Sequence, residues 1–265
     1  MKVIIIGCGP AGLAAAHAAS GHGAEVEILS SSGKTEQRGP LLMQRPIPGI
    51  NTSHPDGTIH QIVIGGGILD YRYKLYGDVN IGINGDILQP YYHAWDHRET
   101  YERLWAAYSD MIIPHHVKGS ELATLHERAD LVVSTASARS MCRSGQMIGG
   151  GEHQFRSQEV AVTPYTSYPN QPPDTIIFNA GEHAPWVRSS MVFGVPVTEW
   201  LVSKAPSSAT RIRKPISTNC NCYPHVLRTG RFGAWKNETW VDTAYWDTYN
   251  AIASMKRSGD LGGIV

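Results

Sequence analysis

Cysteine is scarce in this 265-residue sequence, and neither sign of charge is in excess. The four cysteines are too few for a disulfide framework, so we expect them to be thiols in a reducing compartment. Lys plus Arg and Asp plus Glu each number 23. The net charge therefore does not indicate a nucleic-acid partner, although a local basic groove would still allow one.

Long hydrophobic runs are also lacking. No apolar run reaches the length of a membrane span, and Met1–Gly7 runs directly into a glycine loop without a signal peptide. The sequence thus predicts a cytoplasmic protein with no membrane partner. Apolar residues make up 42% of the chain and charged residues 17%, which is typical of a globular protein.

Recognised metal-ligand and nucleophile motifs are missing as well. Twelve histidines are present, but His93, His97, His115 and His116 do not form a known ligand pattern. Cys220-Asn221-Cys222 is one residue shorter than the usual CxxC spacing, and no second pair of cysteines accompanies it. We therefore predict no metal site, with the cysteines as core or loop thiols. No nucleophile elbow is found either.

The N-terminus carries a glycine-rich loop between a strand and a helix. Lys2–Ile6 is a β-branched apolar run that predicts a buried parallel strand, and Leu13–Ala19 is a strong helix former. Between them lies Gly7-x-Gly9-x-x-Gly12. Glu25–Leu29 predicts the second strand, so the whole segment has the length of one βαβ unit.

The spacing of these glycines has a physical reason. Gly7 permits the tight turn after the strand, Gly9 lets the backbone approach a pyrophosphate, and Gly12 allows close packing of helix on strand. The helix, with Pro10 and Ala11 in its first turn, then presents free N–H groups and the positive end of its dipole to the phosphates. The loop therefore predicts dinucleotide binding by a Rossmann-type sheet.

The end of the second strand departs from the usual dinucleotide pattern. An acidic residue normally holds the ribose hydroxyls there, whereas this chain has Ser30-Ser31-Ser32-Gly33-Lys34. One interpretation is NADP, because hydroxyls and a cation could receive a 2′-phosphate. The other is FAD, with the ribose held by Ser30 and Ser31. The residues themselves leave both open.

Further along the chain, apolar periodicity and breakers predict other elements. Asp96 is expected to cap a helix whose apolar positions recur at three and four. Residues 30–51 read as an extended loop and Arg257–Val265 as a mobile tail. Helices are predicted at Ile68–Tyr76, Glu99–Asp110, Glu121–Arg128 and Val241–Met255, and strands at Ile112–Pro114, Ala129–Thr135, Glu159–Thr163, Thr175–Asn179, Val195–Val202 and Val226–Thr229.

Two segments, one at each end, resemble FAD-dependent oxidoreductases. Gly7–Ala16 (GCGPAGLAAA) is similar to the opening of such flavoproteins, with proline between the second and third glycines. Thr229–Trp235 (TGRFGAW) and Trp240–Ala244 (WVDTA) resemble the last FAD-contacting segment of UDP-galactopyranose mutase and the related amine-oxidase-type flavoproteins. The resemblance implies a noncovalent FAD contacted by Gly230, Arg231 and Asp242.

The middle of the chain carries a patchier likeness. Ile176–Gly181 followed by Trp186–Ser190 resembles the mutases' strand and turn before Tyr-Arg-Ser. By the same resemblance, Thr135 ends a strand that enters the flavin site, and Arg38 and Arg45 flank a loop that passes over the cofactor. The mutases are larger, and their His-rich loop has no counterpart here. The chain also looks similar to compact phage flavoproteins, some of them in gene sets for thymine hypermodification, which would place it in the host cytoplasm.

Three residues are candidates for contact with the substrate. Trp186 could stack on a ring while Arg188 takes an anion or a carboxylate. The alternative is structural packing of Trp186 beside a solvated Arg188. Tyr73 lies in an aromatic cluster that either lines a pocket or packs in the core.

Together these patterns predict an α/β fold, a Rossmann-type FAD-binding parallel sheet with an inserted β-rich substrate part. Residues 1–45, 112–148 and 225–265 are assigned to the FAD-binding domain, and residues 46–111 and 149–224 to the substrate part. The predicted function is oxidation of an amine or carbon substrate by hydride transfer to FAD, acting on a small molecule or a modified nucleobase. Alternatives are a non-redox flavin mutase or lyase, and a nucleotide-binding module without catalysis. Substrate and oligomeric state stay open.

Overall fold

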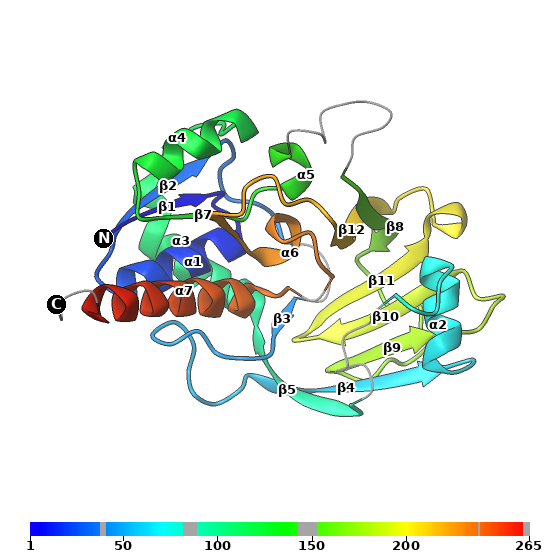
Figure 1. Ribbon diagram of the computed structural model, residues 1–265. Coiled ribbons are helices and arrows are strands. Elements are labelled where there is room, and N and C mark those ends of the chain that lie inside the picture. Colours follow the sequence, from blue (N-terminus) through cyan, green and yellow to red (C-terminus); the bar gives the residue numbers. More distant parts are fainter. Residues whose placement is uncertain (38–40, 82–88, 143–152, 238, 262–265) are drawn as a thin grey trace. The chain divides into compact units, whose positions relative to one another are not determined.

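The computed structural model describes residues 1–37, 41–81, 89–142, 153–237 and 239–261 (Figure 1). It divides the chain into two compact units, each assembled from separate stretches of sequence. Unit 1 comprises Met1–Glu36, Glu99–Phe155 and Ser217–Val265. Unit 2 comprises Gln37–Arg98 and Arg156–Ile216.

Unit 1 is built on a five-stranded parallel sheet with the strand order β13-β7-β1-β2-β6. Its central strand pairs with β2 from Lys2 to Ile6 and with β7 from Val3 to Ile6. The middle strands are apolar at successive positions because both faces of a parallel sheet are covered. The strands are β1 (Lys2–Ile6), β2 (Glu25–Ser30), β6 (Ile112–Pro114), β7 (Leu131–Ser134) and β13 (Val226–Arg228).

Helices from both ends of the chain pack against each other in unit 1. Ala residues make up most of α1, and this small-residue surface lies beside α7, so that the first and last long helices are neighbours (Figure 1). The helices are α1 (Pro10–Gly21), α3 (His97–Tyr108), α4 (Leu122–Glu127), α5 (Ala138–Met141), α6 (Gly230–Gly233) and α7 (Val241–Leu261).

Most of α3 belongs to unit 1, whereas the sequence assigned it to the substrate part. The carboxylate of Asp96 accepts a hydrogen bond from the backbone N–H of Arg98 at 2.8 Å, as expected of a capping residue. Further along the helix, the hydroxyl of Tyr108 lies 2.8 Å from Nδ1 of His17 on α1. The contact between Tyr108 and His17 ties the end of α3 to α1, and the stretch of unit 1 that contains Tyr108 begins at Glu99.

Unit 2 is built on an eight-stranded mixed sheet with the order β12-β8-β11-β10-β9-β4-β5-β3. β9 pairs antiparallel with β10 and parallel with β4, and this parallel pair is what makes the sheet mixed. One helix, α2 (Ile68–Tyr76), belongs to this unit. The strands are β3 (Leu42–Met43), β4 (Gly57–Ile64), β5 (Tyr91–Asp96), β8 (Phe155–Thr163), β9 (Thr175–Asn179), β10 (Trp186–Val192), β11 (Val195–Leu201) and β12 (Thr210–Thr218).

The predicted fold class is confirmed: a parallel Rossmann-type sheet is combined with a separate β-rich part. Three corrections concern elements. The segment Trp186–Val192, to which the sequence assigned no element, is a central strand, since it pairs on both sides. Strands β4, β5 and β12 carry too many polar residues to be recognised from periodicity. Finally, α7 continues to Leu261, so part of the predicted mobile tail is helical.

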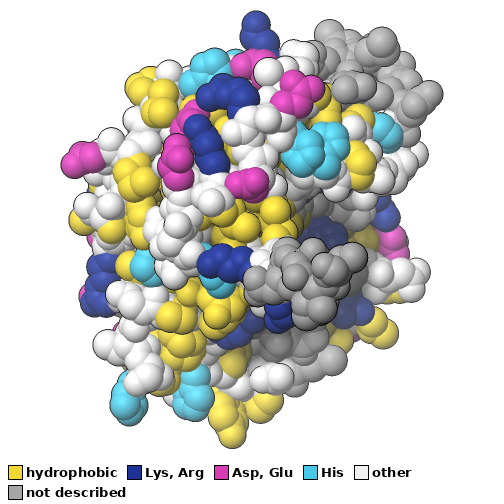
Figure 2. Space-filling view, turned by 60° about the vertical axis from the view of Figure 1, so that its left-hand side comes forward, with side chains coloured by type: hydrophobic (Ala, Val, Ile, Leu, Met, Phe, Trp, Pro, Cys, Tyr) yellow, Lys and Arg dark blue, Asp and Glu magenta, His cyan; other side chains and the backbone are white. Residues whose placement is uncertain are grey.

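Figure 2 shows the charged side chains on one face of the molecule. Over the upper part of the face shown in Figure 2, basic and acidic side chains are interspersed. A mixed surface of this kind does not produce an extended field of one sign. Within the described part of the chain, none of the helices combines the length and the apolar character needed to cross a bilayer.

Candidate functional site

The glycine loop lies at the carboxyl end of β1, and Gly7 makes its turn. Gly7 has a φ of +100°, which is a left-handed conformation that side chains disfavour. Its N–H donates to the carbonyl of Leu29 at 2.8 Å. A Cβ added there would lie 2.7 Å from Oγ1 of Thr135. Both conformation and packing therefore require glycine at this position.

Gly12 lets α1 begin directly against this turn. A Cβ at Gly12 would lie 1.9 Å from the carbonyl oxygen of Gly7 and 2.8 Å from its carbonyl carbon. Because these are backbone atoms, a side chain could be accommodated only by moving the helix or the loop. Gly12 is thus needed for the predicted close approach of helix and strand.

Gly9 differs from its two neighbours in the motif. It is the N-cap residue of α1 with φ −66° and ψ 175°, a conformation open to any residue. A Cβ added at Gly9 would meet no described atom within 4 Å. The packing of the described chain does not require glycine here, and the open space lies at the N-terminus of a 12-residue helix whose first turn has no acidic side chain. This is the arrangement that a bound pyrophosphate needs.

The second motif packs against the first. Gly230 has a φ of +71°, and a Cβ there would lie 2.7 Å from Cβ of Ala11. A Cβ at Gly233 would lie 2.4 Å from the carbonyl oxygen of Ser134. The N–H of Thr229 also donates to that carbonyl at 3.1 Å. Short helix α6 is therefore held against the glycine loop.

Gly233 was not among the predicted site residues. Its signal in the sequence is the GxxG spacing with Gly230, which lets one short helix approach the end of β7. Thr135, at that end, donates both its N–H and its hydroxyl to the carbonyl of Ile6, at 2.9 and 3.0 Å. Its side chain thus joins β7 to β1 just before the glycine loop.

The remaining predicted cofactor residues that the structure describes have different environments. Ser30 is buried, and its hydroxyl donates to the carbonyl of Ser32 at 3.0 Å, which ties the turn after β2. Ser31 is exposed. Arg231 is half-buried in α6, and Asp242 is buried in the first turn of α7. Arg38 lies outside the described residues.

Arg188 in unit 2 belongs to a buried charge network. Its guanidinium donates to Glu199 of the neighbouring strand, and the same carboxylate also accepts from Lys214. Burial alone would raise the pKa of Glu199, but the charges of Arg188 and Lys214 outweigh burial and hold that pKa at about 2. Burial opposes the charged form of Arg188 as well, yet Glu199 keeps the pKa of Arg188 above its ordinary value.

Trp186 and Tyr73 occupy contrasting positions in unit 2. Trp186 packs in a core cluster with Ala161, Ile177 and Trp200, which differs from the predicted stacking on a substrate ring. Tyr73 on α2 is 66% exposed. Trp186 and Arg188 thus lie two positions apart on β10, whereas Tyr73 is an exposed residue of α2.

A lysine that the sequence did not single out lies on α2. Nζ of Lys74 donates to three backbone carbonyls, those of Asn179, Gly181 and Trp186, at 2.8–3.0 Å. Burial, assisted by the charge of Lys204, lowers the pKa of Lys74 to about 8. The side chain thus fastens α2 to the ends of β9 and β10.

One further group of polar side chains gathers in unit 1, although the sequence predicted no metal site. The ligand atoms of Cys142, His153, Cys220 and Cys222 all lie within 4.8 Å of one another. These residues come from the end of α5, from the segment before β8 and from the segment before β13.

Comparison with solved structures gives the type of fold. The sequence matches no protein-family model and no curated protein sequence. Its structure is similar to p-nitrophenol 4-monooxygenase PnpA from Pseudomonas putida DLL-E4, with a TM-score of 0.53 at 14% identity over 97% of this chain and 80% of that one. A variant of Klebsiella pneumoniae HpxO in complex with FAD has a TM-score of 0.52 at 13% identity, over 94% and 79%. The fold is that of FAD-binding flavoproteins.

A third structure shows that this fold also occurs at the present chain length. The PF1083 protein from Pyrococcus furiosus has a TM-score of 0.54 at 9% identity, and the match covers 97% of this chain and 98% of that one. The FAD that HpxO holds agrees with the cofactor that the resemblance to flavoproteins implied. At these identities the likeness concerns the fold, and the activity of this chain has to be argued from its own residues.

Proposed function

We propose that this chain binds FAD noncovalently through the glycine loop of unit 1 and acts as an oxidoreductase on a small molecule or a modified nucleobase. The observation that carries the proposal is the contrast within the loop. Gly7 and Gly12 are required by the packing of the protein itself, whereas Gly9 borders open space at the N-terminus of α1. A residue kept small next to that space fits a pyrophosphate that approaches the backbone.

Several of the predicted residues have a role in this arrangement. Gly9 would let the pyrophosphate approach the first turn of α1, where the backbone N–H groups have no partner within the helix, while Gly7 and Gly12 allow the loop and the helix to pack closely beside it. Arg231 would supply charge-assisted donors to a phosphate, and Ser31 would contact the ribose. When bound, FAD supplies two-electron redox chemistry that the side chains do not provide.

Two versions of the oxidoreductase reaction are considered, and they differ in the electron donor and in the fate of O₂. In the first, the substrate gives a hydride and a proton to the cofactor, and O₂ takes both electrons to form hydrogen peroxide. In the second, a reduced nicotinamide cofactor is the electron donor, and O₂ places one oxygen atom in the substrate and the other in water. Similarity in fold to PnpA, a monooxygenase by name, favours the second version.

Cofactor binding is tested by Gly9→Val. A valine would fill the space beside the first turn of α1, so we expect the purified variant to lose FAD while the wild type is yellow. The matched control is Gly21→Val, because Gly21 lies at the other end of the same helix and its Cβ would likewise meet no described atom within 4 Å. Stoichiometric FAD in Gly9→Val, or a wild type that releases NADP, FMN or no cofactor on denaturation, would refute the binding proposal.

The type of chemistry is tested under anaerobic conditions with oxidised enzyme. Loss of flavin absorbance on adding substrate alone supports the first version, and air should then restore the colour with release of peroxide. Bleaching by NADH or NADPH, followed by one ¹⁸O atom from ¹⁸O₂ in the product, supports the second. Turnover by chemically reduced enzyme without consumption of reductant would identify a mutase or lyase and overturn the oxidoreductase proposal. The screen covers amines, amino acids, nucleotide sugars and thymine-modified DNA.

A further inference from the structure

A compact group of three thiols and one imidazole lies in unit 1, away from the glycine loop in the sequence. Sγ of Cys142 is 3.6 Å from Sγ of Cys222, and both sulfurs approach Nδ1 of His153, at 3.2 and 3.4 Å respectively. The thiol of Cys220 completes a set in which the ligand atoms lie within 4.8 Å of one another. The sulfurs of Cys142 and Cys222 are too far apart for a disulfide, which requires about 2.05 Å.

The separations among Cys142, Cys222 and His153 match those between ligands of one tetrahedral metal ion. With a Zn–S bond of about 2.3 Å, two sulfurs of a tetrahedral site lie about 3.8 Å apart, and a sulfur and an imidazole nitrogen lie about 3.6 Å apart. The observed distances of 3.6, 3.2 and 3.4 Å are within a few tenths of an ångström of these values. Cys₃His is also one of the ligand sets of structural zinc.

Backbone contacts hold the ligands in place. Cys142 ends α5, where its N–H donates to the carbonyl of Ala138 at 3.0 Å. The N–H of Cys220 donates to the hydroxyl of Thr218 at 3.0 Å, and that hydroxyl donates to the carbonyl of Gln154, the residue after His153, at 2.8 Å. The segments that carry the histidine and the Cys-Asn-Cys pair are therefore joined next to the ligands.

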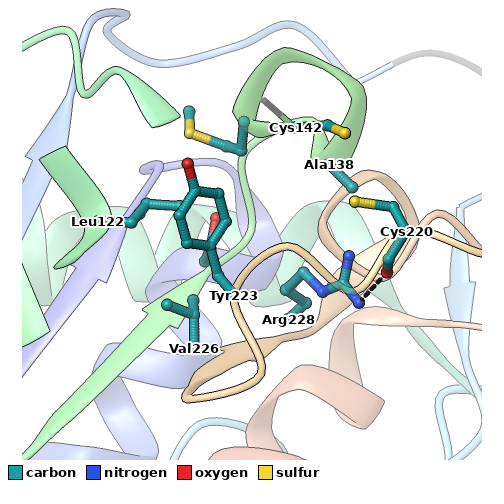
Figure 3. Close-up of a pocket in the computed structure, with 9 residues that line it drawn as sticks. Leu122, Ala138, Cys142, Cys220, Tyr223, Val226 and Arg228 are labelled. Carbon is teal, nitrogen blue, oxygen red and sulfur yellow. Dashed lines mark hydrogen bonds between the residues drawn. The ribbon is translucent and has the colours of Figure 1, made fainter. Parts of the chain in front are cut away.

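The surroundings suit a bound metal better than a substrate. Cys142 and Cys220 are buried, and in Figure 3 they lie on the same side of a small pocket. That pocket has a volume of about 10 Å³, room for about one water molecule. Arg228 lies beside Cys220 and donates to its carbonyl at 2.6 Å. Three thiolates and a neutral imidazole on Zn²⁺ carry one net negative charge, which this guanidinium can offset.

We propose that Cys142, His153, Cys220 and Cys222 bind one structural Zn²⁺ ion. Binding releases the thiol protons to solvent and needs no oxidant or reductant. All four positions are taken by protein ligands, so the ion is closed to substrate and ties α5, the segment before β8 and the segment before β13 together. Its role in unit 1 is to stabilise the structure, independently of the flavin chemistry proposed above.

The metal content of untagged protein, purified under reducing conditions without chelators, is the first test. Elemental analysis should find about one zinc per chain, and a mercurial thiol reagent should release it to a colorimetric indicator. Cys222→Ser and His153→Ala should lose most of the zinc. Cys8→Ser and His225→Ala are matched controls, since Cys8 is in the glycine loop and His225 is exposed, and both should keep it.

A second measurement needs no variant and guards against misfolding. Wild-type protein reconstituted with Co²⁺ should show the intense visible d–d absorption of a tetrahedral thiolate site, at longer wavelength than flavin absorbs, and added Zn²⁺ should abolish it. Chelation should lower the melting temperature by several degrees, reversibly. The proposal is overturned if wild type has less than about a tenth of an equivalent after reconstitution with Zn²⁺, or if native alkylation and mass measurement show a disulfide among the three cysteines in reduced preparations.

Discussion

The two units are stabilised by different means, so different kinds of substitution should destabilise them. Unit 1 places backbone against backbone: Gly12 and Gly233 stand where a single Cβ would collide with a carbonyl oxygen. Unit 2 instead buries charge, with Glu199 held between Arg188 and Lys214 in the middle of a sheet. Substitutions should therefore harm unit 1 mainly through volume and unit 2 mainly through charge.

The largest effect is expected from volume in unit 1. Gly12→Ala places a Cβ 1.9 Å from the carbonyl oxygen of Gly7, so the free energy of unfolding should fall by about 5 kcal/mol, as in the most severe overpacking substitutions. Gly9→Ala should change it by less than about 1 kcal/mol, because a Cβ there meets open space. Urea unfolding followed by circular dichroism measures both. Equal losses in the two variants would contradict the assignment of Gly12 to packing and Gly9 to the ligand.

Charge in unit 2 should produce the next largest effect. Glu199→Gln leaves Arg188 and Lys214 buried without a counter-charge, and breaking a buried ion pair in this way costs about 3–5 kcal/mol. Glu159→Gln on β8 is the matched control, because its ion pair with Arg213 is exposed and worth about 1 kcal/mol or less. Equal stability of the two variants, measured by urea unfolding, would exclude an energetic role for the network.

Low pH should remove the interaction of Glu199 with Arg188 and Lys214 without a mutation. The pKa of Glu199 is about 2 in the folded state against an ordinary 4.5, so its contribution to stability is complete above pH 4.5 and is lost as the pH falls toward 2. Linkage gives roughly 3 kcal/mol in total, of which roughly 2 kcal/mol is lost by pH 3. The stability difference between wild type and Glu199→Gln should therefore narrow by that amount between pH 7 and pH 3. A gap that stays constant would contradict the low pKa.

A smaller effect, on FAD affinity, should distinguish a residue that binds the ligand from one that stabilises the fold. Arg231→Ala should lower FAD affinity about ten- to hundredfold, equivalent to roughly 1.5–3 kcal/mol for a charge-assisted contact to phosphate. Fluorescence titration of the apoprotein with FAD measures this change. Arg188→Ala should leave FAD affinity unaltered and reduce stability instead, because its partner Glu199 is in the core of unit 2. FAD affinity equal in wild type and Arg231→Ala would remove Arg231 from the proposed site.

Local sequence was sufficient for unit 1 because its elements have local causes. The β-branched run at Lys2–Ile6, the three glycines and the Ala-rich helix each predict their own structure, and all are observed. The approach of Thr229–Gly233 to the loop was inferred from resemblance to flavoproteins. Its physical basis is the parallel pairing of β13 with β7, which the sequence of neither strand predicts by itself.

Unit 2 and the thiol cluster were harder to predict for the same reason. Trp186 and Arg188 look like ligand-binding residues in isolation, and only the pairing of β10 with β11 places Glu199 beside Arg188. The cysteines were judged by their spacing along the chain. Cys142 and Cys222 are 80 residues apart, and the fold makes them neighbours. Ligand sets assembled from single residues have no sequence signature of their own.

The adjacency of α1 and α7 has a consequence for how the chain folds as it is made. Residues 217–265 supply unit 1 with β13, an edge strand of its sheet, and with α7, the helix that packs against α1. The two stretches of unit 2, the second of which ends at Ile216, leave the ribosome before residues 217–265 do. The nascent chain must therefore keep helix α1, rich in alanine and buried along most of its length in the folded protein, uncovered until α7 has been made. Chaperone dependence during translation should accordingly trace to α1, which is made well before the helix that packs on it.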